Sequence, residues 1–129
     1  MAEKTVVRTE KAPAPFQGAP YSQAIRAGDL VFVSGQLALE PGHTEIVGDT
    51  IQEQTEQVFR NLAAILDEAG SGVDKVVKTT VFLVNLGDFQ GMNEVYSRWV
   101  GDKPPARATV EISALPSGAL VEIEAVAHL

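Results

Sequence analysis

The sequence contains no cysteine, and this absence removes three kinds of chemistry at once. Without a thiol the chain can form no disulfide, no thiolate metal site and no cysteine nucleophile, and it fits a reducing compartment. Long apolar runs are also missing, since no stretch reaches the ~20 residues that cross a bilayer. The first ten residues lack the apolar segment of a secretory signal. We therefore expect a cytoplasmic protein with no membrane partner.

Basic residues are scarce, with ten Lys and Arg against 17 Asp and Glu, giving a net charge of −7. Nucleic-acid binding depends on neutralising phosphates with cations, so this balance disfavours nucleic acid as a partner. The two histidines, His43 and His128, have no metal-ligand spacing, and no glycine-rich phosphate loop is present. The sequence therefore predicts neither a metal nor a cofactor.

What is present is the pattern of one folded domain over residues 1–129, with 45% hydrophobic residues. The element order is β-β-β-α-β-α-β-β, which predicts an α+β fold with both helices on one face of a sheet. Strands are expected over 5–8, 21–27, 30–36, 75–84, 105–112 and 120–127, and helices over 50–69 and 88–100. Thr50 and Glu53 match a capping box, and Gly70 suits the position just after the first helix.

The strands over 30–36 and 76–84 carry apolar side chains on both faces. Strands buried on both sides have this pattern. Because two helices cover only one face of the sheet, a second copy of the chain is the simplest cover for the other. The sequence therefore predicts a homo-oligomer.

Residues 105–112 and 120–127 both alternate, and Pro116 and Gly118 between them favour a hairpin loop. If both apolar faces meet one core, Arg107 shares the opposite face with Glu122 and Glu124. Arg107 then either binds an anionic substrate or pairs structurally with these glutamates. The glutamates themselves are either a site acid or base, or solvated charges.

Three further polar residues have two interpretations each. The hydroxyls of Tyr21 and Ser34 lie beside turn residues, where they can orient a ligand or satisfy loop backbone groups. Asn93 lies in the apolar stripe of the second helix, so its amide needs a partner, either structural or in a site.

Six segments together resemble the RidA (YjgF) family, in order and spacing, from about residue 4 to the C-terminus. They are Ala19–Ala24, Val33–Gln36, Val77–Leu83, Met92–Tyr96, Pro104–Glu111 and Val121–Ala125. The resemblance implies a chorismate-mutase-like α+β fold and a homotrimer with a central barrel and three sites in the clefts between subunits. It also implies hydrolysis of small 2-imino and 2-enamino acids, such as 2-aminoacrylate and 2-iminobutanoate, to 2-keto acids and ammonia, with no cofactor.

The same resemblance assigns site residues position by position. Catalysis falls on Arg107, Glu122, Tyr21 and Ser34. Substrate binding falls on Arg107, Thr109, Asn93 and Gly35. Thr109 is a departure, because cysteine is common there in the best-studied imine hydrolases, and Ala19 stands where glycine is usual. The alternative function is a non-catalytic trimer that binds small metabolites, or acts as a chaperone, through the same clefts.

Overall fold

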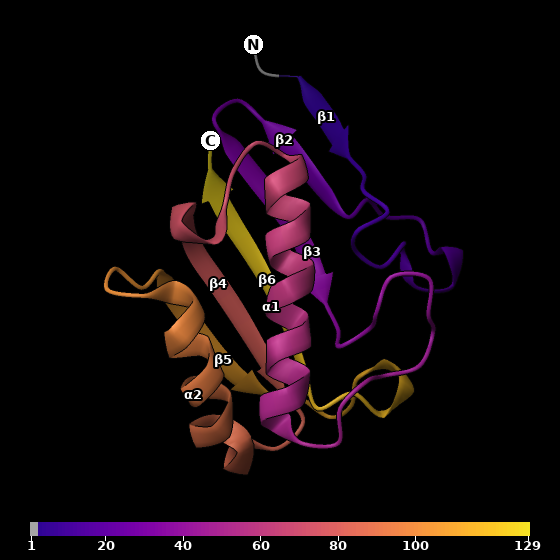
Figure 1. Cartoon of the computed structure of the whole chain (residues 1–129), viewed down its shortest axis with the longest axis vertical. Coiled ribbons are helices and arrows are strands. Elements are labelled where there is room, and N and C mark those ends of the chain that lie inside the picture. Colours follow the sequence, from indigo (N-terminus) through magenta and orange to yellow (C-terminus); the bar gives the residue numbers. More distant parts are fainter. Residues whose placement is uncertain (1–2) are drawn as a thin grey trace.

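The computed structural model describes residues 3–129 as one six-stranded sheet with two helices on the same face (Figure 1). The elements are β1 (Lys4–Val7), β2 (Ala24–Ala27), β3 (Leu30–Gln36), α1 (Ile51–Glu68), β4 (Val76–Leu83), α2 (Phe89–Val100), β5 (Ala106–Glu111) and β6 (Val121–His128). The order of strands in the sheet is β1-β2-β3-β6-β4-β5. The predicted α+β class, element order and one-sided helix layer are confirmed.

The helix α1 begins as the sequence predicts. The Thr50 side chain accepts a hydrogen bond from the Glu53 backbone N–H, and the Glu53 carboxylate accepts one from the Thr50 backbone N–H. These reciprocal bonds satisfy donors that a helix start otherwise leaves free. The pKa of Glu53 is lowered by the hydrogen bond that its carboxylate accepts from the Asp49 backbone N–H and by those from Thr50. The buried stripe of α1 packs on the sheet. Its members include Ile51, Val58, Leu62, Ile65 and Leu66.

The expected hairpin between residues 105–112 and 120–127 is wrong. β5 pairs in parallel with β4, and β6 pairs antiparallel with both β3 and β4, so β4 separates the two strands. The parallel β4–β5 pair is connected through α2, as parallel neighbours require a crossover. Alternation along each strand was real, but it carries no information on which strand lies beside which.

The predicted common face for Arg107 and Glu122 is also wrong. Thr79 of β4 lies opposite Arg107, and Phe82 of β4 lies opposite Glu122. Residues paired across strands share a face, whereas positions 79 and 82 of one strand point to opposite faces. Arg107 therefore lies on the face covered by the helices, and Glu122 on the open face.

The open face of the sheet is apolar over much of its area. Val6, Phe32 and Val110, from β1, β3 and β5, are 49%, 44% and 42% exposed. A single chain thus leaves a broad hydrophobic surface in water, as the two-faced strand pattern predicts. Within residues 3–129, neither helix is long and apolar enough to cross a membrane.

We predict that Thr50→Ala lowers the free energy of unfolding by about 1 kcal/mol, because it removes the N-cap acceptor. Urea denaturation at a fixed protein concentration measures the change. Thr44→Ala is the matched control, since Thr44 is exposed in the loop before the helix. Equal losses for the two variants would contradict a specific capping role.

Candidate functional site

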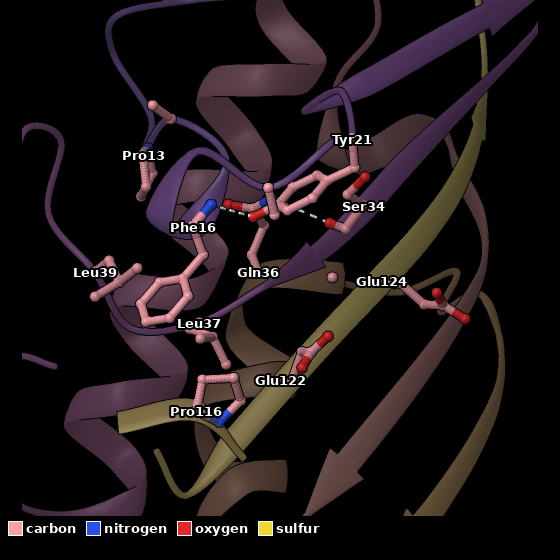
Figure 2. Close-up of a pocket in the computed structure, with 13 residues that line it drawn as sticks. Pro13, Phe16, Tyr21, Ser34, Gln36, Leu37, Leu39, Pro116, Glu122 and Glu124 are labelled. Atoms are coloured by element: carbon pink, nitrogen blue, oxygen red, sulfur yellow. Dashed lines mark hydrogen bonds between the residues drawn. The ribbon is translucent and has the colours of Figure 1, made fainter. Parts of the chain in front are cut away.

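The open face carries a cavity of about 420 Å³ where β3 and β6 meet two loops. Tyr21 and Ser34 lie on one side of it, and Glu122 and Pro116 on the other (Figure 2). Four of the seven residues predicted for the site line this cavity: Tyr21, Ser34, Gly35 and Glu122. Glu124 also lines it, from the next outward position of β6.

Gly35 makes room for the Glu122 side chain. A Cβ atom on Gly35 would lie only 2.8 Å from the Glu122 carboxyl carbon, a contact that real side chains essentially never make. The β3–β6 pairing shifts register between Val33 and Gln36, so Ser34 and Gly35 form an irregularity beside the carboxylate. Such bulges re-aim side chains at sites. The glycine predicted from the sequence is therefore required by a close approach of Glu122.

Glu122 is half-buried, and its environment favours the protonated acid. Burial raises the pKa of Glu122, and the nearby negative charge of Glu124 raises it further. A carboxyl group of this kind can donate a proton at a pH where an ordinary glutamate has already lost it. This is the property that general acid–base chemistry requires.

Two hydroxyls in the cavity have complementary hydrogen-bonding capacity. The Tyr21 hydroxyl accepts a hydrogen bond from the Phe16 backbone N–H at 2.6 Å, so its own proton remains able to donate. The Ser34 hydroxyl donates to the Ser22 carbonyl at 2.6 Å, so its lone pairs remain able to accept. Each hydroxyl thus satisfies a loop backbone group and still offers one bond to the cavity. The two interpretations of these hydroxyls, that they satisfy loop backbone groups and that they orient a ligand, are therefore compatible.

Two tight turns, Phe16–Gly18 and Pro116–Gly118, border the same cavity. Their middle residues, Gln17 and Ser117, have φ values of 54° and 57°. Non-glycine residues seldom adopt this left-handed conformation, and where they do they often lie at sites. Both turns that border the cavity therefore have a strained backbone.

Arg107 lies in a second cluster, on the helix-covered face at the edge strand β5. Its Nη1 donates to Asn93 Oδ1 at 2.8 Å. Its Cζ lies 4.7 Å from the ring centroid of Tyr96 and 5.4 Å from that of Phe89. Among residues 3–129 no carboxylate lies within 4.0 Å of the guanidinium. The structural pairing with Glu122 or Glu124 within one chain is therefore wrong, and the amide of Asn93 has Arg107 as its partner.

Thr109, two residues further along β5, faces the same side as Arg107 because it pairs with Val81. Its hydroxyl is buried and forms no hydrogen bond within the described part of the chain. The structure thus gathers Arg107, Asn93 and Thr109 in one cluster and Tyr21, Ser34, Gly35 and Glu122 in the other, on opposite faces of one sheet.

The sequence did not single out Phe89 and Tyr96 as partners of Arg107, because both fit an apolar helix stripe. The signal was present in the spacing of 89, 93 and 96, which places an amide between two aromatic rings on one helix face. Across residues 3–129, no group of three or more His, Asp or Glu side chains could hold a metal ion.

Comparison with known proteins assigns the chain to a family. A protein-family model described as Endoribonuclease L-PSP, the YjgF/RidA family, matches residues 9–129. The chain belongs to this family. A RutC family protein of Pyrococcus abyssi is 51% identical over 125 residues, covering 97% of both chains. Reactive Intermediate Deaminase A of Arabidopsis thaliana, a chloroplastic protein, is 46% identical over 127 residues, covering 98% of this chain and 67% of that one.

The fold agrees with a solved member of the YjgF/RidA family. The crystal structure of RidA from the Antarctic bacterium Psychrobacter sp. has a TM-score of 0.91 and 41% identity to this chain, covering 97% of it and 99% of RidA. The resemblance predicted from the six sequence segments is therefore confirmed, and the family includes a reactive intermediate deaminase.

We predict that Glu124→Gln lowers the pKa of Glu122, because it removes the negative charge that disfavours a second carboxylate. The pKa should stay above the ordinary value, since burial persists. Carboxyl ¹³C NMR titration measures the shift. Glu68→Gln, at the far end of α1, is the control and should leave the titration unchanged. An unchanged Glu122 pKa in Glu124→Gln would contradict the prediction.

Proposed function

We propose that this protein hydrolyses reactive 2-imino and 2-enamino acids to 2-keto acids and ammonia. The proposal rests on two groups in the two clusters. Arg107 is held by neutral partners in the first, and Glu122 has a raised pKa in the second. A guanidinium with unpaired N–H donors suits a substrate carboxylate. A carboxyl group of raised pKa suits proton transfer. The name of the Arabidopsis relative supports the same reaction class.

The working site is proposed to form between copies of the chain in a homotrimer. One chain keeps Arg107 and Glu122 on opposite faces of its sheet, so a single copy offers each substrate only half of the required groups. β5 is an edge strand, so Arg107 lies at the margin where another copy can bring its Glu122 cavity. The same association covers the exposed apolar face.

In the proposed reaction, Arg107 binds the substrate carboxylate and Asn93 keeps the guanidinium in place. For an enamine, the Glu122 carboxyl protonates the carbon next to the C–N bond, which gives an iminium ion. The resulting carboxylate then takes a proton from a water molecule as that water adds to the electrophilic carbon. The Glu122 carboxyl then gives its proton to the amine nitrogen of the carbinolamine. As the C–N bond breaks and ammonia leaves, the Glu122 carboxylate takes the hydroxyl proton, which leaves the keto acid and restores the acid. Tyr21 donates and Ser34 accepts hydrogen bonds to orient the water or substrate.

Two other functions have weaker support. A binding protein without turnover would use the same cavity, and it is the alternative that an activity assay separates. RNA cleavage is suggested by the wording of the family description. The net charge of −7 argues against it, and neither His43 nor His128, both exposed, is among the residues that line the Glu122 cavity.

We predict that Arg107→Ala abolishes hydrolysis, lowering kcat/KM at least about 100-fold, since a buried or half-buried charged hydrogen bond to substrate is worth about 3 kcal/mol. Imines are generated in situ by an amino-acid oxidase, and semicarbazide traps what remains. Arg98→Ala is the control, because Arg98 is exposed on the same helix as Asn93. Oligomeric state must match before rates are compared. Binding of keto acid without turnover by the unmodified protein would favour the alternative.

We predict that two inactive variants restore activity when they are mixed. Arg107→Ala keeps Glu122, and Glu122→Gln keeps Arg107, so a cleft that takes one residue from each subunit is complete in one of three positions of any mixed trimer. Random 1:1 assembly makes three quarters of trimers mixed, which gives about one quarter of wild-type activity for a cyclic heterologous interface. The measurement is imine hydrolysis after co-refolding.

The control for the mixing experiment is each variant refolded alone, which should remain inactive. A site built within one chain would lack either Arg107 or Glu122 in every subunit of a mixed trimer and would remain inactive. Activity no higher than that of the separate variants, with mixed trimers verified by mass spectrometry, would therefore rule out the shared cleft.

A further inference from the structure

Tyr96 takes no part in the reaction proposed above, yet its ring supports the arginine of the site. The Arg107 Cζ lies 4.7 Å from the centroid of the Tyr96 ring, within the range of a cation–π contact. Tyr96 is 5% exposed, so the contact lies in a desolvated setting where such attraction is strongest. Phe89, the other ring near Arg107, is exposed and lies further away.

The Tyr96 ring is held from two further sides. Its hydroxyl shares a 2.6 Å hydrogen bond with Thr79 Oγ1, and Thr79 is 2% exposed on β4. The ring of Phe59, from α1, meets it edge-on at 5.3 Å and 83°. Tyr96 belongs to α2, so three elements fix one ring. The buried Tyr96 hydroxyl needs a hydrogen-bond partner, and because Thr79 supplies it, the ring is fixed at its hydroxyl end as well as at its edge.

We infer that Tyr96, anchored by Thr79, is a positioning residue that fixes the Arg107 guanidinium for carboxylate binding. Arginine has many rotamers, and ordering it at the moment of binding weakens affinity. The ring beneath the guanidinium and the Asn93 amide at its Nη1 select one orientation in advance. The inference rests on the proposed function, in which Arg107 receives the substrate carboxylate.

The test measures binding of pyruvate, a simple 2-keto acid, by titration calorimetry, alongside imine hydrolysis. Tyr96→Leu removes the ring, so Kd and KM should rise about 3- to 30-fold while kcat is kept, as expected for lost uniform binding. Tyr96→Phe keeps the ring but loses the hydrogen bond to Thr79, so its Kd should lie between those of the wild type and Tyr96→Leu. Val95→Ala is the control, because Val95 is a buried neighbour on the same helix and should destabilise without weakening binding.

A second readout follows Arg107 directly and needs no activity. The Arg107 Nε–H relaxation in ¹⁵N NMR should report a rigid side chain in the wild type and in Val95→Ala, and a mobile one in Tyr96→Leu. If Tyr96→Leu does not fold, Thr79→Val releases the tyrosine hydroxyl and should also mobilise Arg107 and raise Kd.

The outcomes separate this inference from the proposed function. Unchanged Kd and unchanged Arg107 relaxation in Tyr96→Leu, or in Thr79→Val if it replaces that variant, overturn the positioning role, as does an equal loss of binding in Val95→Ala. Unchanged pyruvate binding in Arg107→Ala instead overturns the carboxylate role of Arg107. In that case the relaxation data alone decide whether Tyr96 orders the arginine.

Discussion

The alternation of side chains along β4 is the constraint on which the candidate site depends. β4 lies between β5 and β6, so its two faces decide where the residues of both neighbours point. Thr79 aligns Arg107 with the helix layer, and Phe82 aligns Glu122 with the open face. The sheet therefore separates Arg107, the cation of the candidate site, from Glu122, its carboxylic acid. No side-chain rotation can bring the two together within one chain, and any function that needs both requires a second copy.

The Arg107 cluster and the Glu122 cavity each accommodate their own ionisable group through neighbouring residues of the same chain. Arg107 keeps its charge among an amide oxygen and two aromatic rings, which attract the cation without neutralising it. Burial and the charge of Glu124 raise the pKa of Glu122, so the protonated form, which costs less to bury, is favoured relative to an ordinary glutamate. An anion that enters between the halves meets an uncompensated cation. On the proposed assembly, the carboxylate of the substrate is the missing partner.

Local signals in the sequence predicted the elements well, and non-local pairing is where prediction failed. The capping box at Thr50 and the strand over Leu30–Gln36 depend on neighbouring residues, and both were found. The strand order depends on contacts between β4, β5 and β6 that no short pattern encodes. The expected hairpin assigns Arg107 to the wrong face, and its residue type alone leaves anion binding and structural pairing both open. The role of Gly35 likewise needed the bulge, because only there does a Cβ collide with Glu122.

Association of several copies of the chain would both cover the apolar open face and bring the two halves of the candidate site together. Val6, Phe32 and Val110 are exposed on three different strands, so burying them favours association of chains through the hydrophobic effect. On the proposed assembly, association through this face also brings cavities that contain Glu122 near the edges of other chains. If the site forms there, the energy that holds the oligomer together also pre-organises the cleft, so the substrate need not supply it on binding. Catalytic competence is then a property of the assembly, and each folded chain contributes one half of it.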